Sequence, residues 1–256
     1  MEQDRYVELF EQTKLAAEQG DKNAQSLLGA IYFEGSGVEK NYAEAVKWFK
    51  LAAEQGDASA QNYLGYAYAV GKGVVQNFVE AFKYYKLAAE QGLANAQYSL
   101  AKMYGDEEGV LQDHTKSFRW CKLAAEQGYP AAQVSLGISY GKGKGVKKSH
   151  IKEHMWLNLA AAQNYASAHY NLGYVYATGQ GVKQDYVQAA KLYKLAAEQG
   201  YADAQNNLGV LYYTGKGVKK DFVEAAKWYK LAIAHGATES QINLDRMYED
   251  GLIVVH

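Results

Sequence analysis

The sequence predicts an all-α fold, a solenoid of helix–loop–helix repeats that are each 36 residues long. Internal periods between about 20 and 50 residues are typical of stacked arrays. The segment LAAEQG supplies this period, beginning at Leu15, Leu51, Leu87, Leu123 and Leu195, with weaker copies at Leu159 and Leu231. No stretch alternates polar and apolar residues as a half-buried strand does. The single proline, Pro130, falls in the first turn of a predicted helix, where its missing amide does no harm.

Alignment of the copies organises residues 1–256 as one continuous array. A half repeat covers residues 1–20 and a partial repeat covers residues 237–256. Between them lie six full repeats, at 21–56, 57–92, 93–128, 129–164, 165–200 and 201–236. Because one unit of such an array cannot bury its apolar face alone, we expect a single solenoid rather than several independent domains.

The first helix of each repeat has the pattern AQxxLGxxY, as at Ala60, Gln61, Leu64, Gly65 and Tyr68. Its small and apolar positions are spaced for one face of an α-helix. The glycine of the pattern is expected to let a neighbouring helix approach closely, at Gly29, Gly65, Gly137, Gly173 and Gly209.

A GxGV loop and a helix-capping residue precede the second helix. The side-chain oxygens of Asn41, Asn77, Asp113, Ser149, Asp185 and Asp221 can each accept a free backbone amide. Three residues later, Glu44, Glu80, Gln188 and Glu224 predict a reciprocal capping box in four repeats. The second helix carries a bulky apolar stripe and is expected to end at a left-handed glycine, at Gly20, Gly56, Gly92, Gly128, Gly200 or Gly236.

Composition favours a packed soluble protein and gives no global sign of nucleic-acid binding or membrane insertion. Hydrophobic residues make up 48% of the chain, and 27 Lys and Arg nearly balance 28 Asp and Glu. No apolar run reaches about 18 residues, and the N-terminus lacks the features of a secretory signal. We therefore expect a cytoplasmic protein, or alternatively a periplasmic or secreted mature form whose signal has been removed. The single cysteine, Cys121, is expected to be a buried, unreactive thiol.

The motif AxxLGxxYxxGxGVxxD followed by AxxWYKLAAEQG resembles the Sel1-like repeat, a relative of the tetratricopeptide repeat. The resemblance covers essentially the whole chain. It implies a right-handed α/α superhelix of about six and a half antiparallel helix pairs, used mainly as an adaptor or scaffold for other proteins, often in bacterial signalling or host contact. No cofactor is implied. Some cysteine-rich family members are associated with β-lactam binding and carry a disulfide in each repeat, and a chain with one cysteine lacks such pairs.

Candidate catalytic and metal-binding motifs are weak. Ser149 and Lys152 have the SxxK spacing of a serine β-lactamase, but Ser149 is already explained as a helix cap and no KTG element follows. The run from Gly141 to Ser149 does not match a phosphate-binding loop. His150 and His154 lie four residues apart with Glu153 between them, as metal ligands on a helix can, but His150 occupies a column that usually packs a ring.

The resemblance to tetratricopeptide repeats places a binding site on the concave face, which the first helices line. Two columns on that helix vary between copies. They lie two residues before and two residues after the conserved leucine, and comprise Asn62, Tyr98, Tyr170 and Asn206, and Tyr66, Lys102, Tyr174 and Arg246. Tyrosine and arginine are common at interface hot spots. The alternatives are an ordinary wet surface, or an anionic ligand on the lysine-rich loops, at Lys142, Lys144, Lys147, Lys148, Lys216, Lys219 and Lys220.

These observations predict a non-enzymatic scaffold that binds a protein or peptide. The alternative is an immunity or inhibitor protein that masks a bacterial toxin enzyme, and a remote alternative is a β-lactam-binding hydrolase. The apolar end from Gly251 to His256 either packs back as a cap or forms an edge that associates with another chain, so the oligomeric state stays open.

Overall fold

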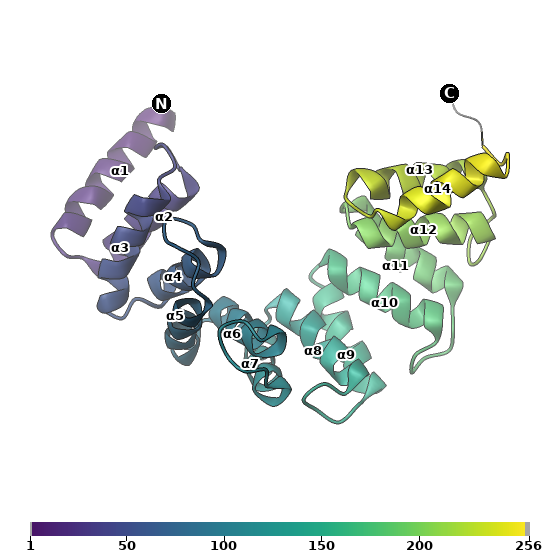
Figure 1. The fold of residues 1–256 in the computed structure, drawn as a ribbon, viewed down its shortest axis with the longest axis horizontal. Helices are drawn as coiled ribbons and strands as arrows, with labels where there is room; N and C mark the ends of the chain where they lie inside the picture. Colours follow the sequence, from purple (N-terminus) through teal and green to yellow (C-terminus); the bar gives the residue numbers. More distant parts are fainter. Residues whose placement is uncertain (1, 254–256) are drawn as a thin grey trace. The chain divides into compact units, whose positions relative to one another are not determined.

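The computed structural model describes the backbone of residues 2–253 and the side chains of residues 10–253 (Figure 1). This part of the chain contains fourteen α-helices and no strand, as the sequence predicts. The helices are α1 (Glu2–Glu18), α2 (Lys22–Glu34), α3 (Tyr42–Glu54), α4 (Ala58–Val70), α5 (Phe78–Glu90), α6 (Ala94–Asp106), α7 (His114–Glu126), α8 (Pro130–Lys142), α9 (His150–Ala161), α10 (Ala166–Thr178), α11 (Tyr186–Glu198), α12 (Ala202–Thr214), α13 (Phe222–Ala234) and α14 (Glu239–Glu249). None of these helices is both long and apolar enough to cross a membrane.

Each full repeat is a pair of packed helices, beginning with α2 and α3 and ending with α12 and α13. Helix α1 is the second helix of the half repeat, and α14 is the first helix of the partial repeat. The helices form two compact units, residues 1–129 and 130–256, and each unit stacks its helices in chain order (Figure 1). The boundary lies one residue from the repeat boundary between residues 128 and 129, and continuity of the array across it stays a prediction.

Within a repeat, the conserved glycine of the first helix lies against a large side chain of the second helix. A β-carbon added to Gly65 would lie 2.6 Å from the ring of Tyr85. The same ring contact is made at Gly29, Gly173 and Gly209, whereas Gly137 faces Leu157. The prediction that these glycines permit close helix packing is confirmed, because any side chain there would displace the ring.

The second helices begin where the capping residues predict. The Asp185 carboxylate accepts from the backbone amides of Val187 and Gln188, at 2.9 and 3.0 Å. The prediction of a reciprocal capping box is wrong, because the backbone N–H of each capping residue donates to a carbonyl of the first helix and not to the side chain three residues later. In Asp185 it donates to the Tyr176 carbonyl at 3.0 Å, and Asn41, Asn77 and Asp221 use Tyr32, Tyr68 and Tyr212 in the same way. The glycine loop thus brings the capping residue back to the last turn of the first helix. There a tyrosine carbonyl accepts the backbone amide of the capping residue.

Buried glutamines connect neighbouring repeats, a feature that the sequence analysis did not identify. Gln25 donates to the carbonyl of Ala17 in the preceding second helix, and accepts from the Gln55 amide at the end of its own repeat. The same arrangement recurs with Gln61 and Gln97. Each amide therefore links three helices, and the Gln of both AQ and EQG has a structural role.

The C-terminal end packs back on the last helices as far as it is described. Leu252 and Ile253 lie against the buried cluster that α13 and α14 share, and the Leu252 amide donates to the Met247 carbonyl at 2.9 Å. Val254, Val255 and His256 lie outside the described residues.

Candidate functional site

The predicted column two residues after the conserved leucine lies on the solvent side of the first helices. Leu64 and Leu172 are buried, and a residue two positions later points to the opposite side of an α-helix. Tyr66 and Tyr174 are accordingly 39% and 46% exposed. Lys102 and Arg246, in the same column, are also exposed. We call these four residues the exposed column.

The column two residues before the leucine contacts the next repeat. The Tyr98 ring lies 5.4 Å from that of Tyr129, and the Tyr170 ring lies 5.0 Å from that of Tyr201, measured between centroids. Asn62 is half-buried at the corresponding position. Tyr98 and Tyr170 therefore pack at junctions between repeats.

Asn206, the last member of that column, is buried, with 9% of its surface exposed. Its side-chain oxygen accepts from Ser240 Oγ at 2.9 Å and from Asn243 Nδ2 at 3.2 Å. The side-chain oxygen of Asn206 is therefore used in hydrogen bonds to the next repeat. The contacts of this column differ between repeats, because Tyr98 and Tyr170 contact aromatic rings whereas Asn206 accepts hydrogen bonds.

A pocket of about 250 Å³ opens beside Tyr174 in the second unit. Helices α10 and α12 form its walls, Tyr186 and Tyr193 of α11 contribute aromatic rings, and Lys216 of the following glycine loop stands at its edge. The other lining residues are Ala177, Thr178, Asn207, Val210, Leu211 and Thr214. We call this the α10–α12 pocket.

The polar groups of the α10–α12 pocket are few. Burial raises the pKa of the Tyr193 phenol, and the nearby Asn207 side chain offsets part of this rise. The hydroxyls of Thr178 and Thr214 donate to carbonyls of their own helices, at 2.8 Å in each case. The Lys216 ammonium lies 5.3 Å from the centre of the Tyr186 ring. Aromatic and aliphatic surface with one cation at its edge suits an apolar or aromatic group.

The histidine pair of the fourth repeat does not converge on a common point. His150 Nδ1 lies 2.6 Å from Glu153 Oε2, whereas His154 Nε2 lies 3.2 Å from the Tyr176 hydroxyl. Within the described residues, no three His, Cys, Asp or Glu side chains are grouped as metal ligands. Glu153 is buried over Gly141, which leaves room for its carboxylate.

The other reactive side chains have structural roles. Ser149 Oγ accepts from the Lys152 amide and so caps α9. Cys121 is buried, and desolvation raises its thiol pKa to about 12, which disfavours the nucleophilic thiolate. Lys220, one of the loop lysines, lies over the Phe222 ring at 4.7 Å from its centre. These contacts give no catalytic pair.

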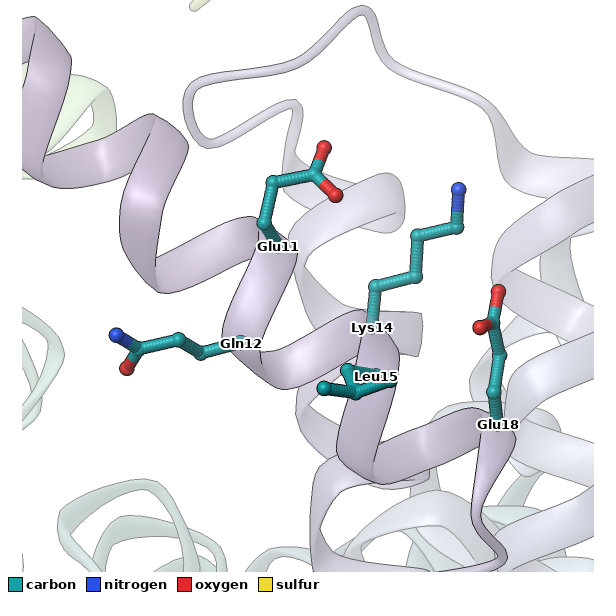
Figure 2. Close-up of a pocket in the computed structure, with 5 residues that line it drawn as sticks. All are labelled: Glu11, Gln12, Lys14, Leu15 and Glu18. Atoms are coloured by element: carbon teal, nitrogen blue, oxygen red, sulfur yellow. The ribbon is translucent and has the colours of Figure 1, made fainter.

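Two further hollows lie at the ends of the array. Glu11, Gln12, Lys14, Leu15 and Glu18 line the first, and Figure 2 shows that all five come from α1 and that their side chains spread apart. A single helix surface does not enclose a ligand. The second lies where a further repeat would stack, between α13 and the end of the described chain, with Leu231, Tyr248 and Ile253 among its lining residues.

Comparison with known proteins agrees with the repeat boundaries. The family model described as Sel1 repeat matches six consecutive segments, residues 22–57, 58–93, 94–129, 130–165, 166–201 and 202–236. No curated protein matches the chain.

Solved structures include similar chains. A protective antigen of uropathogenic Escherichia coli strains with an SLR fold is 37% identical, with a TM-score of 0.83 over 95% of this chain and 52% of the antigen. The present chain thus spans about half the length of that antigen. A Sel1 repeat protein from Oxalobacter formigenes is 33% identical, with a TM-score of 0.80 over 84% of this chain and 86% of that one. An immunity protein from Pseudomonas aeruginosa shares the fold, at 23% identity and a TM-score of 0.56 over 82% of each chain.

Proposed function

Because the chain belongs to the Sel1 repeat family, we propose that it is a non-enzymatic scaffold that binds a protein or peptide along the exposed side of its first helices. Protein–protein interaction is the general role of this family. The observation that carries the proposal is the exposed column. Tyr66, Lys102, Tyr174 and Arg246 occupy one helical position in different repeats. Tyrosines supply contact area at little cost in conformational entropy, and arginine is common at interface hot spots.

The rest of the described chain supports binding rather than turnover. Ser149 serves as a cap and the Cys121 thiol is held protonated, so neither is prepared for nucleophilic attack. The fold also favours an extended interface, because each stacked repeat exposes the same position of its first helix to solvent.

A matched pair of variants tests the proposal in the full-length chain. One carries Tyr66→Ser, Tyr174→Ser and Arg246→Ser on the first helices. The control carries Val79→Ser, Val187→Ser and Val223→Ser, which replace exposed residues of the second helices. In pull-downs from cell extract, a specific partner is expected with the wild type and the control and is lost with the first variant. Equal retention by both variants, with unchanged circular dichroism, would refute the assignment.

The immunity alternative differs in the nature of the partner. The likeness to the Pseudomonas aeruginosa immunity proteins lies below 25% identity and therefore indicates the shared fold alone. An immunity role requires that the captured partner be an enzyme whose activity this chain inhibits. An activity assay of the partner with and without the chain separates the two functions.

A further inference from the structure

One position between consecutive repeats is filled in the first unit, and its equivalent four repeats later, in the second unit, is open. In the first unit it lies between α2, α3 and α4. The Phe33 ring is 5.7 Å from that of Tyr63 and 5.9 Å from that of Tyr66, centroid to centroid. The Lys72 ammonium lies over this group, 5.6 Å from the Phe33 ring and 5.4 Å from the Tyr66 ring. The chain thus fills this position with its own aromatic side chains and places a lysine above them.

Four repeats later, the three side chains that fill the position are all smaller. Ala177 stands where the first unit has Phe33, Asn207 replaces Tyr63, and Val210 replaces Tyr66. The α10–α12 pocket, with its volume of about 250 Å³, occupies this place. The pocket therefore corresponds to rings that the second unit lacks.

Part of the surroundings of the three rings is retained. Tyr186 occupies the position of Tyr42, and Lys216 occupies that of Lys72. The lysine keeps its place over the tyrosine ring, at 5.3 Å in the second unit and 5.2 Å in the first. Two other lining residues are larger than their equivalents, because Tyr174 replaces Ala30 and Leu211 replaces Ala67. The second unit thus keeps the tyrosine and the lysine at the edge of the site, lacks the three side chains that fill it in the first unit, and has two bulkier walls.

We propose that the α10–α12 pocket is an anchor site for one aromatic side chain, phenylalanine or tyrosine, of the bound segment. An apolar cavity of about 150 Å³ is large enough for benzene, so the pocket has room for a phenyl ring. The Lys216 ammonium supplies a cation–π contact, and Leu211 and Tyr193 supply the apolar floor. Tyr174 of the exposed column lines the same pocket, so the anchor deepens the proposed function and rests on it.

The probe for this site is N-acetyl-L-phenylalanine amide, with N-acetyl-L-alanine amide as its control. Binding is followed by NMR of the full-length chain, through the methyl resonances of Val210 and Leu211. We expect saturable shifts with the phenylalanine probe and none with the alanine probe. Shifts that are equal for the two probes, or absent with the phenylalanine probe up to its solubility limit, contradict the proposal.

A variant that copies the first unit provides the structural control. Ala177→Phe, Asn207→Tyr and Val210→Tyr restore the three rings that Phe33, Tyr63 and Tyr66 supply, and loss of the probe shifts is expected. Val210→Tyr alone serves if the triple variant does not fold. Retained binding in the filled variant, followed through Leu211, overturns the assignment.

The pull-down distinguishes a failure of this pocket from a failure of the scaffold role. A partner that is lost with the exposed-column variant but kept by the filled variant contradicts the anchor and leaves the scaffold role intact. A probe that binds the wild type and not the filled variant, while no partner depends on the exposed column, supports the pocket and contradicts the scaffold role.

Discussion

The Gln91 side chain donates to Gln61 Oε1 at 2.8 Å, across the two helices of one repeat. Gln61 is 5% exposed, and its amide in turn donates to the Ala53 carbonyl of the preceding repeat at 3.3 Å. A single buried side chain thus joins three helices. Such amides fix the register between repeats, because a shifted repeat would leave a buried polar group without a partner.

Replacing this glutamine is expected to weaken the array. Gln61→Leu removes two hydrogen bonds, the one to the Ala53 carbonyl and the one from the Gln91 amide, and should lower the free energy of unfolding by about 1 to 3 kcal/mol. Gln91→Leu, at the exposed end of the same link, should cost only about 0.5 to 1.5 kcal/mol. Urea denaturation of both variants and of the double variant measures the coupling. Fully additive losses would show that the two amides act independently.

The glycine–ring contact predicts a specific rescue. Gly65→Ala places a methyl group 2.6 Å from the Tyr85 ring and should destabilise the protein by about 1 to 3 kcal/mol. The third repeat has Ala101 and Cys121 in the two equivalent positions, so the chain already contains a larger first residue with a smaller second one. Adding Tyr85→Cys should therefore recover part of the stability in thermal melts. A double variant less stable than both single variants would contradict this explanation.

The capping geometry gives different roles to Asp185 and Gln188, which the sequence pattern places together in one predicted capping box. Asp185→Ala removes the acceptor for two backbone amides of α11 and should cost about 1 kcal/mol. Gln188→Ala should cost much less, because the Asp185 amide donates to Tyr176 rather than to the Gln188 side chain. Denaturant melts of the two variants provide the comparison. Equal losses of stability in the two variants would show instead that the Gln188 side chain takes part in a reciprocal capping box.

Buried tyrosines predict a loss of stability at high pH. Desolvation raises the pKa of Tyr85 and of Tyr229 from 10.0 to about 12 in the folded chain. The folded state therefore holds its phenolic protons more tightly than the unfolded state. The associated stability is present below pH 10.0 and is lost as pH rises towards about 12. Tyr85→Phe should show a shallower decline in urea denaturation across this range, and an identical decline would contradict the assignment.

The repeat boundaries, the helix starts and the glycine contacts follow from the sequence because each depends on residues that are close in the chain or recur in register. Asn41 as a cap and Gly65 as a close contact are examples of this kind. The glutamine links join residues about one repeat apart, so the sequence shows both partners without indicating that they meet.

The candidate site was harder to predict for the same reason. Tyr66 and Tyr174 could be placed from helix periodicity alone. Asn206 could not, because its burial depends on Ser240 in the next repeat. The α10–α12 pocket arises from three simultaneous reductions in size, at Ala177, Asn207 and Val210, on helices whose contact only the fold establishes.

Amide hydrogen exchange of the full-length chain, alone and with its captured partner, tests the central claim most directly. If the chain is a scaffold that binds along its first helices, added protection should fall on α4, α6, α10 and α14, around Tyr66, Lys102, Tyr174 and Arg246. The second helices α5 and α11, which carry the control residues Val79 and Val187, should be unchanged. Protection confined to the second helices or to the lysine-rich loops would contradict the account.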